Sequence, residues 1–216
     1  MEVKRSLSHS GAVAPLFYSV ASAGRAITDA RELLWSRAMD QHAHPERLLA
    51  DGSVPLGSDE LLRRFDALGI AHRTARHAPV YTVAESRELR ADFPGGHSKN
   101  LFLRNKKGRM WLVTCQEDRE INLKELAERL GAGRFSFASA ERLMRYLGVV
   151  PGAVTPFAVV NDRGGAVHMV VDAGLLAHDP LNFHPLDNAM TTAVSAGDLL
   201  RFLEHAAHTP QIIDLG

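Results

Sequence analysis

The chain has 216 residues, enough for one domain and an appendage, and its 45% hydrophobic and 23% charged residues are ordinary for a soluble globule. Lys and Arg together number 25, as do Asp and Glu, so the net charge of zero excludes a general nucleic-acid coat, which would be more basic. Any RNA partner must therefore be held by a local patch. The single cysteine, Cys115, excludes an internal disulfide and suits a reducing, cytoplasmic compartment.

The first 24 residues have the outline of a secretory signal, with Lys4 and Arg5 followed by a short apolar stretch and Ala21-Ser22-Ala23. The acidic Glu2 and the Ser and Pro interruptions favour a disordered leader instead, or an upstream start codon read as part of the gene. No apolar run approaches the length of a membrane span, so no membrane partner is expected.

A helix is predicted over residues 26–39, and Pro and Gly in residues 41–57 predict a linker. We therefore expect an extension and linker, disordered or partly helical, over residues 1–57, and a folded domain over residues 58–216.

Helices in the domain are predicted from capping residues followed by apolar spacing and a terminal Gly. Ser58 and Asn122 are expected N-caps, with stops at Gly69 and Gly131. The remaining predicted N-caps are Thr82, Ser139 and Ser195. The helix after Thr82, Val83 to Leu89, would end just before Pro94 and is a candidate lid on a site.

Apolar runs bounded by turn residues predict short strands. Two hairpins are expected, one around residues 105–108 and one around Arg163-Gly164-Gly165. The predicted strands cover residues 70–76, 101–104, 110–114, 157–161, 167–172, 190–194 and 211–215. Since they do not alternate strictly with helices, an α/β (α+β mixed) fold is expected, with helices packed around a mixed sheet.

Three stretches carry candidate chemistry. Gly95-Gly96-His97-Ser98-Lys99-Asn100 opens the strand Leu101-Phe102-Leu103-Arg104, and Gly152-Ala153-Val154-Thr155-Pro156 opens the apolar run 157–160. Phe183-His184-Pro185-Leu186-Asp187-Asn188 follows later in the chain. Each stretch alone also fits a plain loop: a solvated lysine, a turn between helix and strand, or a histidine bonded to backbone.

Together and in this order, the three stretches resemble the YbaK-type editing domains, and most of all the freestanding proteins that deacylate mischarged Ala-tRNA(Pro), the PrdX or ProXp-ala type. The resemblance runs from about Ser58 to Leu215. It implies a curved, barrel-like mixed sheet surrounded by helices, no cofactor or metal, and a tRNA(Pro) acceptor end as partner. It also implies transient contact with prolyl-tRNA synthetase or an elongation factor, and no DNA partner.

Ester hydrolysis needs donors fixed near the growing oxyanion, and the resemblance assigns such roles to residues of the three stretches. Lys99 would give a cation to the carbonyl or terminal phosphate, and Asn100 an amide donor. Gly152 would allow close backbone approach, Thr155 would orient water, and His184 would position water, bind the terminal ribose or act as general base. The implied substrate-binding residues are Gly96, His97, Ala153, Val154, Pro156 and Asn188.

Side chains alternate along a strand, so Lys99 and Asn100 cannot both enter one cleft from regular strand structure. We therefore expect both in the turn, with strand pairing beginning at Leu101. The cations on and around the first hairpin form either a solvated face or a patch that flanks the pocket and contacts tRNA phosphates. These cations are Arg104, Lys106, Lys107 and Arg109.

Other candidates are weaker. His205 and His208 lie three apart on a predicted helix, but no further metal ligands have suitable spacing, so both are expected at the surface. Cys115 is expected to be a small core residue rather than a nucleophile. The sequence thus predicts a trans-editing deacylase of Ala-tRNA(Pro). A Cys-tRNA(Pro) deacylase of the same fold and a non-catalytic tRNA-binding or regulatory module are the alternatives.

Overall fold

The computed structural model describes residues 48–79 and 93–216. The signal-like leader, the helix predicted over residues 26–39 and the candidate lid over residues 83–89 lie outside the described residues. In the part of the chain that is described, no helix is long and apolar enough to cross a bilayer.

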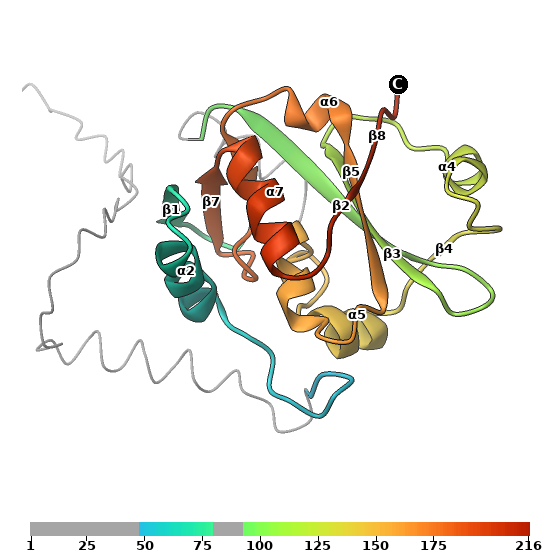
Figure 1. Cartoon of the computed structure of the whole chain (residues 1–216), viewed down its shortest axis with the longest axis horizontal. Helices are drawn as coiled ribbons and strands as arrows, with labels where there is room; N and C mark the ends of the chain where they lie inside the picture. Colours follow the sequence, from blue (N-terminus) through green and yellow to red (C-terminus); the bar gives the residue numbers. More distant parts are fainter. Residues whose placement is uncertain (1–47, 80–92) are drawn as a thin grey trace, which may run out of the picture.

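An eight-stranded mixed sheet is the centre of the described part (Figure 1). Its order is β1-β7-β6-β2-β3-β5-β8, with β4 beside β2 and off this path. β2 pairs antiparallel with β3, whereas β3 with β5, β5 with β8, and β2 with β6 are parallel. The strands are β1 His72–Arg76, β2 Gly96–Arg104, β3 Met110–Gln116, β4 Ser136–Phe137, β5 Val167–Asp172, β6 Leu181–Phe183, β7 Met190–Val194 and β8 Gln211–Ile213.

Helices bury two hydrophobic clusters against the two sides of the sheet. The larger includes Phe102 and Leu112 with side chains of α2, α5 and α7, while the smaller includes Leu103 and Trp111 with side chains of α4. Neighbouring strand residues thus go to opposite clusters, as strand alternation requires. The helices are α2 Ser58–Ala67, α4 Leu123–Arg129, α5 Ala140–Leu147, α6 Ala173–Leu176 and α7 Ala196–His205, with the 3-10 helix η1 Pro156–Asn161.

Most predicted caps are confirmed. The side chains of Asn122, Ser139 and Ser195 accept backbone N–H bonds at the starts of α4, α5 and α7, and Asn122 also donates to Glu125 in a reciprocal capping pair. The prediction for α2 is off by one residue, because Gly57 occupies the N-cap position and makes no side-chain cap.

The second predicted hairpin is wrong. Residues 156–161 form η1 rather than a strand, and β5 pairs in parallel with β3 and β8. Thr155 caps η1 and Pro156 occupies its first turn. The run is buried on nearly all sides, from Phe157 at 0% exposed to Asn161 at 3%. A short continuous apolar run lacks the periodicity that separates helix from strand.

The expected placement of Lys99 and Asn100 in a turn is also wrong. β2 begins at Gly96, and regular pairing with β3 already includes Ser98↔Gln116, Lys99↔Cys115 and Asn100↔Thr114. Lys99 and Asn100 therefore extend from opposite faces of one strand.

Candidate active site

Asn100 fastens β2 to the Gly152–Pro156 loop. Its side-chain Nδ2 donates to the carbonyl of Val154 at 3.0 Å, and its Oδ1 accepts from the hydroxyl of Thr114 at 2.7 Å. The structure thus brings two of the three motifs together, but it uses the Asn100 amide to position the loop.

Within that loop the predicted residues fall into two groups. Gly152 lies in an exposed turn with φ of +92°, a backbone conformation that favours glycine. Ala153, Thr155 and Pro156 are buried. The Thr155 hydroxyl accepts the backbone N–H of Phe157 at 3.4 Å as the cap of η1, and Thr155 is 0% exposed. The hydroxyl thus caps η1 and is shielded from solvent, and its water-orienting role stays a prediction.

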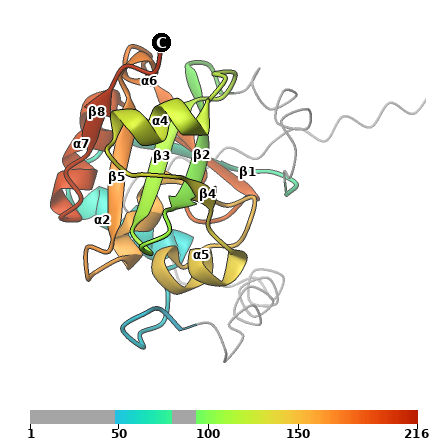
Figure 2. The ribbon, with the colours of Figure 1, turned by 90° about the vertical axis from the view of Figure 1, so that its right-hand side faces the viewer.

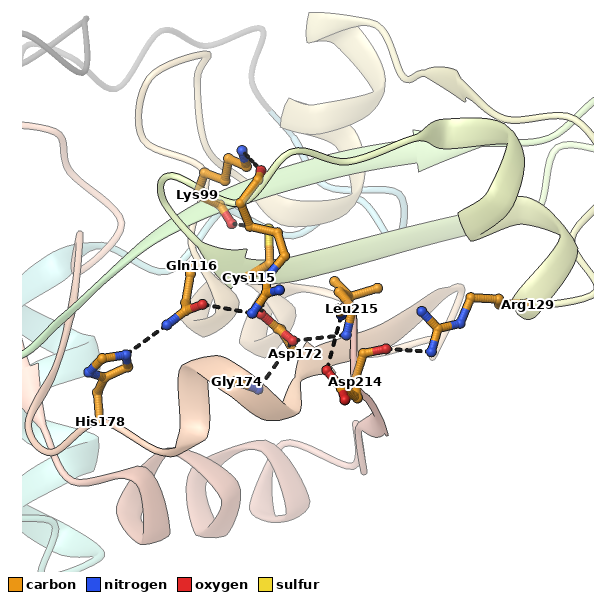
Figure 3. Close-up of polar contacts among 11 residues, drawn as sticks. Lys99, Cys115, Gln116, Arg129, Asp172, Gly174, His178, Asp214 and Leu215 are labelled. Carbon is orange, nitrogen blue, oxygen red and sulfur yellow. Dashed lines mark hydrogen bonds and ion pairs between the residues drawn. The ribbon is translucent and has the colours of Figure 1, made fainter.

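Lys99 lies on the other face of β2, where its ammonium group donates to the carbonyl of Arg119. Arg119 in turn donates to the Asp172 carboxylate at 3.1 Å and to the Gln116 side chain at 2.7 Å. Gln116 meets the ring of His178 at 2.7 Å. A continuous polar network therefore runs from Lys99 to His178 (Figure 3).

Asp172 is the buried centre of this network, with none of its surface exposed. Besides Arg119, it accepts the backbone N–H groups of Gly174 and Leu215, each at 3.2 Å. A buried carboxylate is stable only when paired and hydrogen-bonded, and here a guanidinium and two amides meet that need. Arg119 and Asp172 were not among the predicted site residues, although Asp172 ends the apolar strand β5 and Arg119 lies three residues beyond the apolar strand β3.

Gly95 and Gly96 serve a close approach within the chain itself. The Gly96 N–H donates to the carbonyl of Pro180 at 2.9 Å. A Cβ on Gly96 would lie 2.8 Å from His178 Cβ, and one on Gly95 would lie 2.1 Å from the Pro180 carbonyl oxygen. Gly96, an implied substrate-binding residue, thus packs tightly against the segment from His178 to Leu181.

His184 lies directly after β6, the strand that pairs in parallel with the start of β2. That pairing joins Gly96 to Leu181 and His97 to Asn182, and it ends two residues before Lys99. The His184 Nδ1 contacts the Met190 carbonyl at 2.7 Å; since a carbonyl only accepts, Nδ1 carries the proton and Nε2 is the basic nitrogen of the neutral ring.

Burial lowers the pKa of His184 from its usual 6.5, and the hydrogen bond to the Met190 carbonyl opposes that effect only in part. The ring is therefore neutral at pH 7 and can accept a proton. His77, which was not among the predicted site residues, lies beside it with ring centres 6.3 Å apart and contacts the Thr191 hydroxyl at 2.9 Å.

The other two predicted binding residues near this site are held by the chain. His97 contacts the Phe93 carbonyl through Nε2 at 2.8 Å. Asn188 is 8% exposed and lies in the loop that follows His184.

The basic hairpin lies at the opposite end of β2 from the Gly-Gly turn. Lys106 and Lys107 occupy its exposed tip, as predicted, and Arg109 lies over the Trp111 ring at 5.3 Å. Arg104 is five residues beyond Lys99, about 17 Å along a strand. The hairpin therefore does not border the Lys99 and His184 position directly.

Two further expectations have different outcomes. Cys115 is fully buried, as predicted, and burial raises the pKa of its thiol to about 11, so at neutral pH it is not a thiolate nucleophile. His208 was expected at the surface but is 6% exposed, because its Nε2 contacts Asp162 at 3.0 Å.

In the described ranges no group of three or more His, Cys, Asp or Glu side chains could hold a metal.

A groove of about 300 Å³ lies beside β1, β6 and β7. It includes Asn182, the register partner of His97, but none of the residues predicted for the site. Its lining is Ala71, His72, Arg73, Phe93, Pro94, Pro180, Asn182, Ala193, Val194 and Ser195.

Comparison with known proteins identifies the family. The aminoacyl-tRNA editing domain matches residues 77–202, more than half of the chain. The chain belongs to the aminoacyl-tRNA editing domain family. It is 36% identical over 156 residues to the prolyl-tRNA editing protein ProX of Acetoanaerobium sticklandii, covering 72% of this chain and 95% of that protein. Membership makes the chain an aminoacyl-tRNA deacylase with the YbaK-type fold.

Two other proteins extend the comparison. The prolyl-tRNA synthetase associated domain-containing protein 1 of Bos taurus is 39% identical over 159 residues, covering 71% of this chain and 92% of that one. A solved structure described as a candidate trans-editing enzyme for prolyl tRNA synthetase has a TM-score of 0.58 and 18% identity. It covers 73% of this chain and 96% of that one, and at this identity it supports the fold alone.

Proposed function

We propose that this chain is a trans-editing hydrolase that deacylates mischarged tRNA(Pro), with Ala-tRNA(Pro) as its substrate. The observation that carries the proposal is the 36% identity to a prolyl-tRNA editing protein across 95% of that relative's length. The structure supports the chemistry with two groups on neighbouring segments, the Lys99 ammonium on β2 and the neutral His184 ring directly after β6, which pairs with the start of β2.

In the proposed reaction, water attacks the ester carbonyl that joins the amino acid to the terminal ribose. The Nε2 of His184 accepts a proton from water or from a ribose hydroxyl, and its Nδ1 is oriented by the Met190 carbonyl. Lys99 supplies positive charge to the oxyanion or to the terminal phosphate. Asn100 acts indirectly by holding the Gly152–Pro156 loop against β2.

Selectivity for alanine would be steric, because proline is the larger amino acid. A difference of one or two methylene groups contributes only about 1–3 kcal/mol in a simple pocket, so discrimination by size alone is modest. Cys-tRNA(Pro) is the natural competitor on the same site.

The proposed partners are the acceptor end of tRNA(Pro) and, transiently, prolyl-tRNA synthetase or an elongation factor. A cytoplasmic location is proposed with them, because charged tRNA is used there. The fully buried, unpaired Cys115 is compatible with that reducing compartment.

The test is a set of deacylation assays with Ala-, Cys- and Pro-tRNA(Pro) at equal concentrations. We expect rapid release of alanine, slower release of cysteine and no release of proline above the uncatalysed rate. Preferential release of cysteine would assign the chain to the competing specificity. Binding of tRNA without release of any amino acid would instead support a non-catalytic module.

A further inference from the structure

Phe137 is an aromatic side chain placed in solvent. It is 61% exposed, and in the described part of the chain no other Phe, Tyr or Trp is exposed to that extent. Single exposed apolar residues are common at surfaces, so exposure alone carries no conclusion. The position of this ring relative to Lys99 and to the basic hairpin indicates a role in binding.

The strand β4 that carries Phe137 pairs with β2 through Leu103↔Phe137 and Arg104↔Ser136. Since β3 occupies one edge of β2 over Ser98–Arg104, β4 must lie on the other edge, as Figure 2 also shows. That edge is the one that β6 occupies at Gly96 and His97. The His184 segment and Phe137 therefore flank one stretch of the same strand edge.

Phe137 also faces the same side of the sheet as Lys99. Lys99 and Leu103 are four residues apart and share a face, and directly opposed residues of an antiparallel pair point the same way. The separation along β2 is about 14 Å. Stacked nucleotides advance by about 3.4 Å each, so this length corresponds to about four nucleotides.

Positive charge continues beyond the ring. The hairpin segment from Arg104 to Arg109 carries four cations and no carboxylate, and Lys106 and Lys107 are exposed at its tip. An exposed aromatic ring beside cations is the arrangement that binds single-stranded nucleic acid, because every base has a face that can stack and every nucleotide brings a phosphate.

We propose that the single-stranded 3′ end of the tRNA lies along this edge of β2, with its terminal ribose near Lys99 and His184 and an upstream base stacked on Phe137. The basic hairpin then meets the phosphates where the acceptor stem begins. This inference rests on the proposed function for its partner, an RNA acceptor end. It adds the direction of the RNA on the protein and the residue that stacks it.

The experiment compares wild type with Phe137→Ala, Phe137→Trp and the control Val54→Ala, which trims another exposed apolar side chain far along the chain. One arm measures the affinity of a fluorescent four-nucleotide RNA of sequence ACCA without any amino acid. The other measures kcat and KM with Ala-tRNA(Pro). For Phe137→Ala we expect about tenfold weaker RNA binding and a matching rise in KM, with kcat unchanged.

Phe137→Trp should restore both values, and Val54→Ala should change neither. In the double charge-reversal variant, Lys106→Glu with Lys107→Glu, the affinity for uncharged tRNA should depend less on salt, because fewer counterions are released. Wild-type affinity and KM in Phe137→Ala would overturn the inference even if deacylation is intact. If wild type deacylates no charged tRNA(Pro), the proposed function fails, and the four-nucleotide arm still decides whether Phe137 stacks RNA.

Discussion

Lys99 and Asn100 are neighbours with opposite roles. Asn100 has both ends of its amide engaged by the Val154 carbonyl and the Thr114 hydroxyl, so it acts as a structural link. Lys99 extends from the other face and is held only through its ammonium group on the Arg119 carbonyl. Such an ammonium can turn toward a substrate without breaking the fold.

Lys99→Ala should therefore lower the deacylation rate on Ala-tRNA(Pro) about 10²- to 10³-fold, the usual cost of losing one preorganised donor. Its free energy of unfolding should change little, because the side chain loses a single hydrogen bond to a backbone carbonyl. The measurement is kcat at saturating substrate with a urea unfolding curve as the control. Wild-type turnover would remove Lys99 from the mechanism.

The pH dependence should report on His184. Burial lowers the pKa of this ring, so the neutral, proton-accepting form predominates above a value lower than the usual 6.5. We expect kcat/KM to fall as pH drops through that lowered pKa and to be flat between pH 7 and 8. In His184→Asn the acidic limb should disappear together with most of the activity; an unchanged acidic limb would assign it to another group.

At the scale of elements, the parallel ends of β3 and β5 build the support for Lys99. Gln116 ends β3 and Asp172 ends β5, and Arg119 in the following loop bonds both. The backbone N–H of Leu215, two residues past β8, also reaches Asp172. Three strands therefore fix the carbonyl that holds the lysine.

This arrangement predicts that Asp172 acts through Lys99. Asp172→Asn should lower kcat about tenfold in the wild-type background, because the loop that carries the Arg119 carbonyl loses its ionic anchor. In a Lys99→Ala background the same change should cost little more activity, since residues that act as a unit are non-additive. Equal losses in both backgrounds would show that Asp172 is purely structural.

Asp162→Asn is the matched control for that cycle. Asp162 is also a buried carboxylate that accepts a backbone N–H, from Val167, and meets a basic side chain, His208. It lies at the opposite end of β5 from Asp172, so its loss should affect stability and leave kcat near wild type.

At the scale of the whole molecule, the described part of the predicted linker packs against the domain. Leu49 is 4% exposed, the Ala50 N–H donates to the Arg145 carbonyl at 2.7 Å, and the Leu56 N–H donates to Asn161 Oδ1 at 2.8 Å. These contacts predict a stable unit that begins before the expected boundary at residue 58.

Two truncations test where the unit begins. Removing residues 1–47 should leave the free energy of unfolding and the deacylation rate unchanged. Removing residues 1–57 should lower the free energy of unfolding by at least about 2 kcal/mol, mainly through the loss of buried Leu49. Equal stability of the two shortened proteins, measured by urea unfolding, would restore the boundary at residue 58.

His208 joins the end of α7 to the loop before β5, and it makes global stability depend on pH. Burial alone would lower its pKa, but the hydrogen bonds to Asp162 and to the Ala206 carbonyl outweigh that effect and raise it. A group whose folded pKa is raised stabilises the fold most below its unfolded value of about 6.5, and that contribution is lost as pH rises through the folded pKa.

Wild type should therefore lose about 1–3 kcal/mol of unfolding free energy between pH 6 and pH 9 relative to His208→Gln. Urea unfolding at several pH values measures the difference. Parallel pH profiles for the two proteins would contradict a charged His208 in the fold.

Local signals along the chain were sufficient for much of the secondary structure. Asn122, Ser139 and Ser195 satisfy the first N–H groups of their helices from within one turn, so their effect is visible in the sequence. The hairpin that presents Lys106 and Lys107 is likewise closed by its neighbour Asn105, whose side chain accepts two backbone N–H bonds. The three motifs of the candidate site were recognised by their resemblance to the editing-domain family, and the roles of their residues stay predictions.

Tertiary structure decided what those residues touch. Residues 156–161 form η1, and the sequence did not show this because a segment buried on nearly all sides lacks the periodicity that distinguishes helix from strand. Lys99 and Asn100 separated to opposite faces because pairing with β3 already includes them. Arg119 meets Asp172 from 53 residues away, since the parallel strands β3 and β5 end at the same edge of the sheet. Contacts of that range depend on strand order and register, which no short stretch of sequence encodes.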